Sequence, residues 1–180
     1  MHHLPVVNGL AEVVKSLYHK GGMMIKLFGW ALDKEKERRI EVLQKVHLFK
    51  GLRRNLLMKL LVDLVEKEYE PGEIIFSEGE IGKALYIILD GSVAIAKKCN
   101  GDCAVLAELP AGSYFGELAL IDQMPRFATA TTQERTTLLI MYKSYFDDLI
   151  KGSPAISSRV LLNLVELLSA YVRKNHEKRT

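Results

Sequence analysis

The first third of the chain has the hydrophobic spacing of three helices. Apolar residues recur every three or four positions after Asn8, a good N-cap residue, and this first pattern ends at Gly21-Gly22. A charged stretch at 33–39 then leads into apolar residues at helical spacing, which predicts a second helix with a solvated face. The predicted helices are one over about 8–19, one that runs from the charged stretch through Ile40, Leu43 and Val46, and one over about 53–64.

The segment between the first two predicted helices is compact and apolar. Residues 23–30 contain two aromatic side chains, Phe28 and Trp30. Such rings can dock on the body of the protein, on a second subunit or at a membrane interface. The pattern favours docking on protein and leaves the other two surfaces open.

The period changes after Val65, where short segments rich in β-branched and aromatic residues alternate with turn signals. Turns such as Glu70-Pro71-Gly72, Asp90-Gly91 and Asn100-Gly101 recur at the spacing of about eight to twelve residues that is typical of an antiparallel sandwich or barrel. The predicted strands are 74–76, 84–89, 92–98, 104–109, 127–132 and 137–142.

A helical period returns at Ser153-Pro154 and continues toward the C-terminus. The apolar stripe of this predicted helix is wide, and part of it forms a seam whose members are three and four residues apart: Leu161, Leu164, Leu168 and Tyr171. Packing on the barrel and pairing with a second copy explain this seam equally well. The architecture is therefore helices, then a β-barrel or sandwich, then a long terminal helix.

The composition is that of an ordinary globular protein. Apolar residues make up 48% of the 180 residues and charged residues 26%, and the net charge of +3 is too weak to favour nucleic acid as a partner. No run approaches the roughly 18 uninterrupted apolar residues of a membrane span, and no signal peptide begins the chain, so we expect no transmembrane segment and a cytoplasmic location. Cys99 and Cys103 flank a predicted turn as free thiols or as a reversible disulfide, and no histidine lies near enough to make a metal site.

One segment carries the features of an anion site. A short stretch, Gly116 to Ile121, is bounded by a glycine and a proline, so it can form only one or two helical turns, whose first N–H groups lack partners and attract an anion. Arg126 can turn its guanidinium group back to the same place, and the Glu117 carboxylate can accept a hydrogen bond from a sugar hydroxyl. Phosphate and ribose together indicate a nucleotide. The alternative is that Glu117 only complements the helix dipole and Arg126 forms a surface ion pair.

These residues resemble a known motif. The string FGELAL (115–120), followed by Pro125-Arg126-x-Ala128-Thr129, is similar to the phosphate-binding cassette of the cyclic nucleotide-binding domain family, the β-roll of catabolite activator and protein kinase A regulatory type. Glycines at positions 72, 79, 82 and 91 agree with the glycine-punctuated strands of that family, and the resemblance covers residues 47–175.

The resemblance implies a fold and domain boundaries. It implies an α+β, mainly β fold, in which an antiparallel β-roll or jelly-roll barrel is flanked by N-terminal helices and a long C-terminal helix. The expected parts are an N-terminal helical extension at 1–46, the β-roll at 47–152 with its cassette at 115–129, and a lid or dimerisation helix at 153–180.

The resemblance also implies roles for individual residues. Glu117 holds the ribose 2′-hydroxyl, Arg126 pairs with the cyclic phosphate, and the N–H groups of Leu118, Ala119 and Ala128 complete the cradle that Gly116 opens. Phe127 stands where the family usually has Ala, Ser or Thr, which favours cAMP over cGMP because a hydroxyl there assists recognition of cGMP. Leu120 and Phe146 match the family's hinge contact, and the candidate lids over the base are Leu164, Leu168, Tyr171 and Arg173.

The function expected from these features is that of a stand-alone sensor. It binds cAMP, or cGMP, as a regulatory ligand without a further cofactor, and it signals by rearranging its flanking helices toward a protein partner or a second copy. The sequence has no recognisable nucleophile–base arrangement, so we expect that the protein is not an enzyme. No helix-turn-helix follows the long helix before Thr180, so we expect no binding to nucleic acid. The competing hypothesis is a ligand-free protein-interaction module on the same fold.

Overall fold

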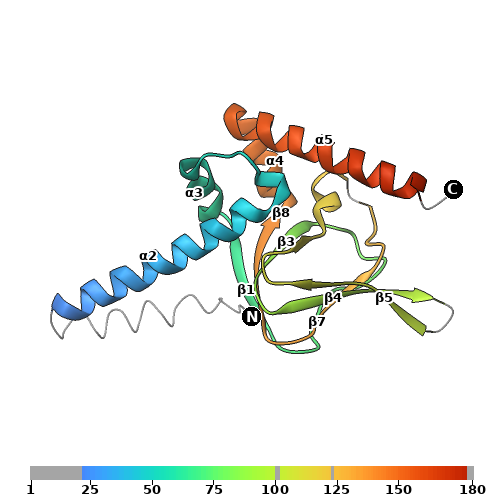
Figure 1. The fold of residues 1–180 in the computed structure, drawn as a ribbon, viewed down its shortest axis with the longest axis horizontal. Coiled ribbons are helices and arrows are strands. Elements are labelled where there is room, and N and C mark those ends of the chain that lie inside the picture. The colour runs from blue at the N-terminus through green and yellow to red at the C-terminus, as the bar shows by residue number, and fades with distance from the viewer. Residues whose placement is uncertain (1–21, 100–101, 123, 178–180) are drawn as a thin grey trace, which may run out of the picture. The chain divides into compact units, whose positions relative to one another are not determined.

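The computed structural model describes residues 22–99, 102–122 and 124–177. Along the described chain, eight strands and a short 3-10 helix, η2, come after an N-terminal group of helices and before a C-terminal one, as the colours of Figure 1 show. The elements are α2 (Gly22–Lys45), η1 (His47–Phe49), α3 (Arg54–Val62), β1 (Val65–Tyr69), β2 (Ile74–Phe76), β3 (Ala84–Asp90), β4 (Ser92–Cys99), β5 (Asp102–Pro110), β6 (Tyr114–Phe115), η2 (Glu117–Leu120), β7 (Thr129–Thr132), β8 (Thr136–Tyr142), α4 (Lys143–Gly152) and α5 (Pro154–Glu177).

The chain divides into two compact units, Met1–Arg38 and Arg39–Thr180, and α2 crosses the division. The first unit is described only from residue 22, as the start of α2. The second unit begins before the expected boundary at 46/47, because Ile40 and Leu43 on the last turns of α2, and Val46 just after it, are fully buried in its core.

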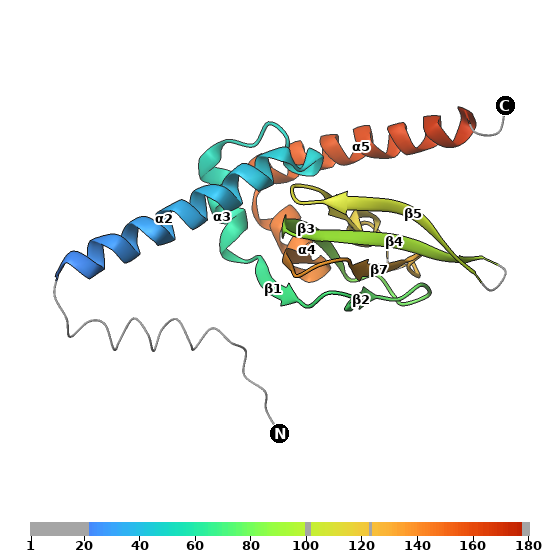
Figure 2. The same cartoon turned by 60° about the horizontal axis from the view of Figure 1, so that its bottom comes forward.

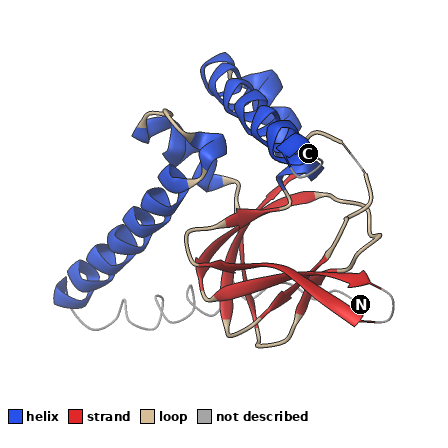
Figure 3. Ribbon diagram, turned by 45° about the vertical axis from the view of Figure 1, so that its right-hand side comes forward, coloured by secondary structure: helices blue, strands red, loops and turns tan. Residues whose placement is uncertain are grey.

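The strands of the second unit form two antiparallel four-stranded sheets, which confirms the expected β-roll. One sheet has the order β1-β8-β3-β6 and the other β2-β7-β4-β5. Figure 3 shows the strands gathered in one body with α4 and α5 outside it. Strands β4 and β5 form the longest hairpin and run side by side in Figure 2.

The central strands β3 and β8 are buried on both faces, which explains their continuous apolar sequences. Alternate residues of β3, Leu85, Ile87 and Leu89, pack on the helices outside the roll, where they join Phe49, Leu60, Phe146 and Val160. Residues on the other face of β3 point into the roll, where Ala84 and Ile88 meet Phe76, Phe115 and Ala130. The sheet therefore separates a helical core from a core inside the roll.

Several elements differ from the expectation. The apolar segment 23–30 and the second predicted helix are one continuous helix, α2, and strand β1, strand β6 and helix α4 were not predicted. Strand β1 reads VEKEY, and only Tyr69 in it is buried, so the sequence lacks the alternation of a half-buried strand. The helix expected at 8–19 lies outside the described residues, as do the side chains of Cys99 and Cys103.

Within the described residues, one helical segment, Pro154–Arg173 in α5, has the length and hydropathy of a membrane span. Arg159 and Glu166 interrupt it, so no uninterrupted apolar run predicts it. A helix that packs on a protein core meets the same criteria, and Ile156 and Val160 of α5 are buried in the helical core.

Candidate functional site

The turn of the cassette is made by Gly116, which follows β6 and caps η2. Its backbone has φ +79°, in the left-handed region that side-chain-bearing residues rarely adopt. A Cβ atom at this position would also lie 2.7 Å from Nη1 of Arg126 and 3.1 Å from the carbonyl oxygen of Ala84. A glycine is therefore required both by the turn and by the arginine packed against it.

The backbone of Arg126 is fixed by a loop that precedes β3. Its N–H donates to the carbonyl of Glu80 at 2.7 Å, and its own carbonyl accepts from the N–H of Gly79 at 2.8 Å. Next to these two bonds, Ile81 and Pro125 form an isolated antiparallel bridge. This local pairing places the side chain of Arg126 at the start of η2, where it donates to the carbonyl of Gly116.

The guanidinium group of Arg126 is held by backbone carbonyls. Nη1 donates to the carbonyl of Gly116 at 3.2 Å, and Nη2 donates to that of Ala84 at 2.8 Å. Arg126 is only 9% exposed, and its Cζ lies 4.1 Å from the ring centroid of Phe76. In the described part of the chain no carboxylate forms an ion pair with it.

This arrangement compensates the charge of Arg126 only in part. Burial lowers the pKa of its guanidinium, and the phenol of Tyr86 and the carboxylates of Glu117 and Glu80 oppose that shift without cancelling it. A buried cation is costly unless an anion approaches it. The site is thus prepared for one negatively charged group.

Gly82 packs tightly against the cassette. A Cβ atom on Gly82 would lie 2.7 Å from the Cβ of Ala119 and 3.4 Å from the Arg126 side chain, so a glycine allows the loop before β3 to approach both residues this closely. Ala119 and Ala128, two of the predicted cradle residues, are buried. The N–H of Ala119 donates to the carbonyl of Gly116 at 3.2 Å, whereas that of Leu118 lies in the first turn of η2, where the helix offers no acceptor.

Glu117 is buried and accepts a hydrogen bond from the hydroxyl of Tyr171 on α5. Burial, and then the hydrogen bond to this carboxylate, raise the pKa of Tyr171, so its hydroxyl remains a proton donor. In Figure 1 the C-terminal half of α5 passes over η2, as this contact requires. Glu117 keeps a second oxygen, Oε2, for another donor.

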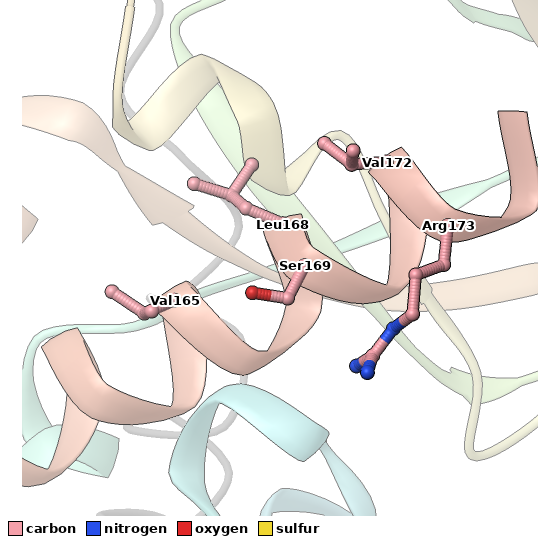
Figure 4. Close-up of a pocket in the computed structure, with 5 residues that line it drawn as sticks. All are labelled: Val165, Leu168, Ser169, Val172 and Arg173. Carbon is pink, nitrogen blue, oxygen red and sulfur yellow. The ribbon is translucent and has the colours of Figure 1, made fainter. Parts of the chain in front are cut away.

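The structure separates the four candidate lids. Tyr171 contacts the cassette, and Leu164 is buried in the helical core. Leu168 and Arg173 line a shallow groove on α5 with Val165, Ser169 and Val172, and Figure 4 shows the Arg173 side chain pointing away from Val172. Leu164 and Tyr171, two members of the predicted dimer seam, therefore face the rest of the second unit. Self-association through α5 stays a prediction.

The predicted hinge residues lie together in the helical core. Leu120 and Phe146 are both buried there. A second link, which the sequence analysis missed, runs parallel to them: Nζ of Lys143 donates to the carbonyl of Leu120 and to Oδ1 of Asp147, both at 3.0 Å. No sequence signal distinguishes this lysine from the others.

Phe127 follows Arg126 and is 62% exposed, so its ring does not fill the space beside the guanidinium. The aromatic residues that do lie against Arg126 are Phe76 and Tyr86, which the sequence analysis placed only in strands. Phe76 and Tyr86 reach Arg126 through pairing between segments far apart in the sequence, so no local sequence pattern predicts these contacts.

Comparison with known proteins agrees with this geometry. Residues 66–153 match the family model of the cyclic nucleotide-binding domain. A cAMP-dependent protein kinase regulatory subunit of Yarrowia lipolytica is 37% identical over 92 residues, which cover 51% of this chain and 24% of that protein. A CRP-like cAMP-activated global transcriptional regulator of Mycobacterium tuberculosis is 30% identical over 129 residues, 71% of this chain and 58% of that protein.

The solved structures agree as well. A cyclic nucleotide-binding domain from Methylobacillus flagellatus has a TM-score of 0.69 at 26% identity, and the similarity covers 81% of this chain and 83% of that one. This chain spans less than two thirds of the length of both curated relatives.

Proposed function

Because the chain belongs to the cyclic nucleotide-binding domain family, we propose that it is a regulatory sensor that captures a cyclic purine nucleotide, cAMP in preference to cGMP, and reports the capture through α5. The observation that carries this proposal is the buried guanidinium of Arg126, which donates to two backbone carbonyls and, among the described residues, forms no ion pair with a carboxylate. A cyclic phosphodiester is a monoanion and would dock at the start of η2, beside this guanidinium.

The two ends of the nucleotide would engage different residues. Arg126 pairs with an exocyclic phosphate oxygen, and the unpaired N–H groups at the start of η2 and near Ala128 supply further donors. The ribose 2′-hydroxyl donates to Oε2 of Glu117. Oε1 of the same carboxylate already accepts from Tyr171, so ligand and helix meet on one side chain.

The shared carboxylate gives the signal a physical basis. A ligand shifts a conformational equilibrium only through its different affinity for the two states. A nucleotide seated on Glu117 lies beneath the ring of Tyr171 when α5 is docked, and it gains contact area in that state alone. Capture therefore stabilises the docked C-terminal half of α5, and a protein partner or a second copy of the chain reads that change.

Phe127 supports the preference for cAMP. It offers no hydroxyl to the guanine edge, and its exposed ring leaves the cradle open. In Phe127→Thr we expect the affinity for cGMP to rise relative to that for cAMP. An unchanged ratio of the two dissociation constants would remove Phe127 from the account of specificity.

Calorimetric titration tests the proposal. Wild-type protein should bind cAMP, and Arg126→Gln should bind it about 10- to 100-fold more weakly, because a charge-assisted contact contributes roughly 1.5–3 kcal/mol. Arg135→Gln is the matched control, since that exposed arginine pairs with Glu68 at 2.6 Å on the surface. Glu117→Gln should lose affinity for cAMP but little for 2′-deoxy-cAMP. No binding heat with either cyclic nucleotide at millimolar concentration would favour an interaction module without a ligand.

A further inference from the structure

Three aromatic rings lie behind the guanidinium of Arg126. Phe76 comes from β2 in one sheet, and Tyr86 and Phe115 come from β3 and β6 in the other. Tyr86 and Phe115 are register partners whose rings stack at 5.2 Å, and the ring of Phe76 lies 5.6 Å and 5.9 Å from them. This aromatic cluster, Phe76, Tyr86 and Phe115, bridges the two sheets where the cassette meets the roll.

Arg126 rests on one member of the cluster in particular. Its Cζ lies 4.1 Å from the ring centroid of Phe76 and 5.7 Å from that of Tyr86. Phe76 is itself 9% exposed and is paired in register with Ala130, a small residue. The contact is therefore shielded from water, where the attraction between a cation and a π face is strongest.

A ring face and a carboxylate differ in whether they leave the charge and the N–H donors of Arg126 available to a ligand. A carboxylate within hydrogen-bond distance would orient the guanidinium but would also neutralise it and compete with an incoming phosphate. The face of Phe76 attracts the cation through its quadrupole and takes none of its N–H donors. The side chain is thus oriented while its charge stays available to an anion.

We infer that Phe76 is a positioning residue for anion capture: its ring face, within the aromatic cluster, holds the guanidinium of Arg126 in the orientation that receives a cyclic phosphate. This inference rests on the proposed function and adds to it a residue outside the cassette. Phe76 touches no ligand, and it acts only through Arg126.

Stepwise fluorination of the Phe76 ring separates this role from simple packing. The full chain would carry phenylalanine, 4-fluoro-, 3,5-difluoro- or 3,4,5-trifluorophenylalanine at position 76, which weakens the π face progressively and hardly changes the shape of the ring. Affinity for cAMP, measured by calorimetry, should fall with each fluorine and reach a loss of about tenfold in the trifluoro variant. A structural role would give no such gradient.

Phe115 provides the matched control. It belongs to the same cluster and is equally buried, but its face stacks on Tyr86. The same series at position 115 should change the affinity for cAMP by less than about twofold. Equal gradients at the two positions would show an effect of the cluster as a whole and would overturn the specific role of Phe76.

The outcomes also separate this inference from the proposed function. If wild-type protein binds cAMP and the series at position 76 is flat, the positioning role is wrong and the sensor stands. If wild-type protein binds no cyclic nucleotide, the sensor and the positioning role fail together.

Phe76→Leu, checked for folding by its thermal transition, should lose at least as much affinity for cAMP as the trifluoro variant. Wild-type affinity in Phe76→Leu would contradict the inference.

Discussion

The two halves of α5 are attached to the rest of the second unit in different ways. In the first half, Ile156, Val160 and Leu164 are buried in the helical core, and Nδ2 of Asn163 donates to the carbonyls of Leu48 and Lys50 at 3.0 and 2.8 Å. In the second half, Tyr171 donates one hydrogen bond to Glu117, while Val172 and Arg173 are exposed.

The difference separates anchoring from sensing. The first half packs as a core helix does, so its removal would destabilise the whole second unit. The second half buries little apolar surface, so its docking is a local equilibrium that a small free energy can shift. The contact that holds it lies on Glu117, a proposed ligand residue, which places the weakest attachment where a nucleotide would act.

The largest effect is expected from Leu164→Ala. This side chain is 7% exposed in the helical core, and its truncation should lower the free energy of unfolding by about 2–4 kcal/mol through lost burial and a cavity. Denaturant unfolding measures it. Val165→Ala, at the neighbouring exposed residue, should change the free energy of unfolding by less than about 0.5 kcal/mol. Equal losses in the two variants would contradict the anchoring role of the first half.

Asn163→Ala should lower the free energy of unfolding by about 1–3 kcal/mol, because two carbonyls on and after η1 lose their donor and the asparagine is nearly fully buried. The same unfolding experiment measures the loss. Ser158→Ala, an exposed position one turn earlier whose hydroxyl bonds only within the helix, is the control. A neutral Asn163→Ala would mean that apolar packing alone anchors the helix.

Tyr171→Phe should act locally. Loss of a half-exposed hydrogen bond to a carboxylate costs about 1 kcal/mol or less, and the buried first half of α5 keeps the global stability unchanged. Amide hydrogen exchange should quicken by about fivefold at 166–173 and stay the same at 156–164. Faster exchange along the whole helix would show that the two halves open as one.

Glu166→Gln should have the smallest effect. Glu166 lies 3.5 Å from Nε2 of His47, and both side chains are substantially exposed. Such surface pairs contribute about 0–0.5 kcal/mol, so both the unfolding curve and the exchange pattern should match the wild type. A loss above about 1 kcal/mol would place a further anchor at the middle of α5.

The cassette could be proposed from the sequence because its chemistry is local. Gly116, Glu117 and Arg126 lie within eleven positions, and the turn, the carboxylate and the guanidinium are each required by residue type. The strands of the roll were also legible, since turn residues separate them and β3 and β8 are continuous apolar runs.

The parts that sequence could not provide depend on contacts between distant segments. The Phe76 ring meets Arg126 only because β2 pairs with β7, more than fifty residues later, in one sheet. Tyr171 was one of four candidate lids, since a wide apolar stripe leaves the rotation of α5 undetermined until Leu164 is known to be buried. Helix α4 is a different case, because its sequence does carry helical spacing: Tyr145, Phe146, Leu149 and Ile150 all pack on the helical core, so this helix was predictable and was not predicted.

Hydrogen exchange along α5 in the wild-type protein, with and without saturating cAMP, tests the central claim most directly. We expect cAMP to slow amide exchange at 166–173 by at least about fivefold and to leave 156–164 within about twofold. An unchanged second half at a concentration where calorimetry shows binding, or equal slowing along the whole helix, would contradict a signal that passes through Tyr171 and Glu117.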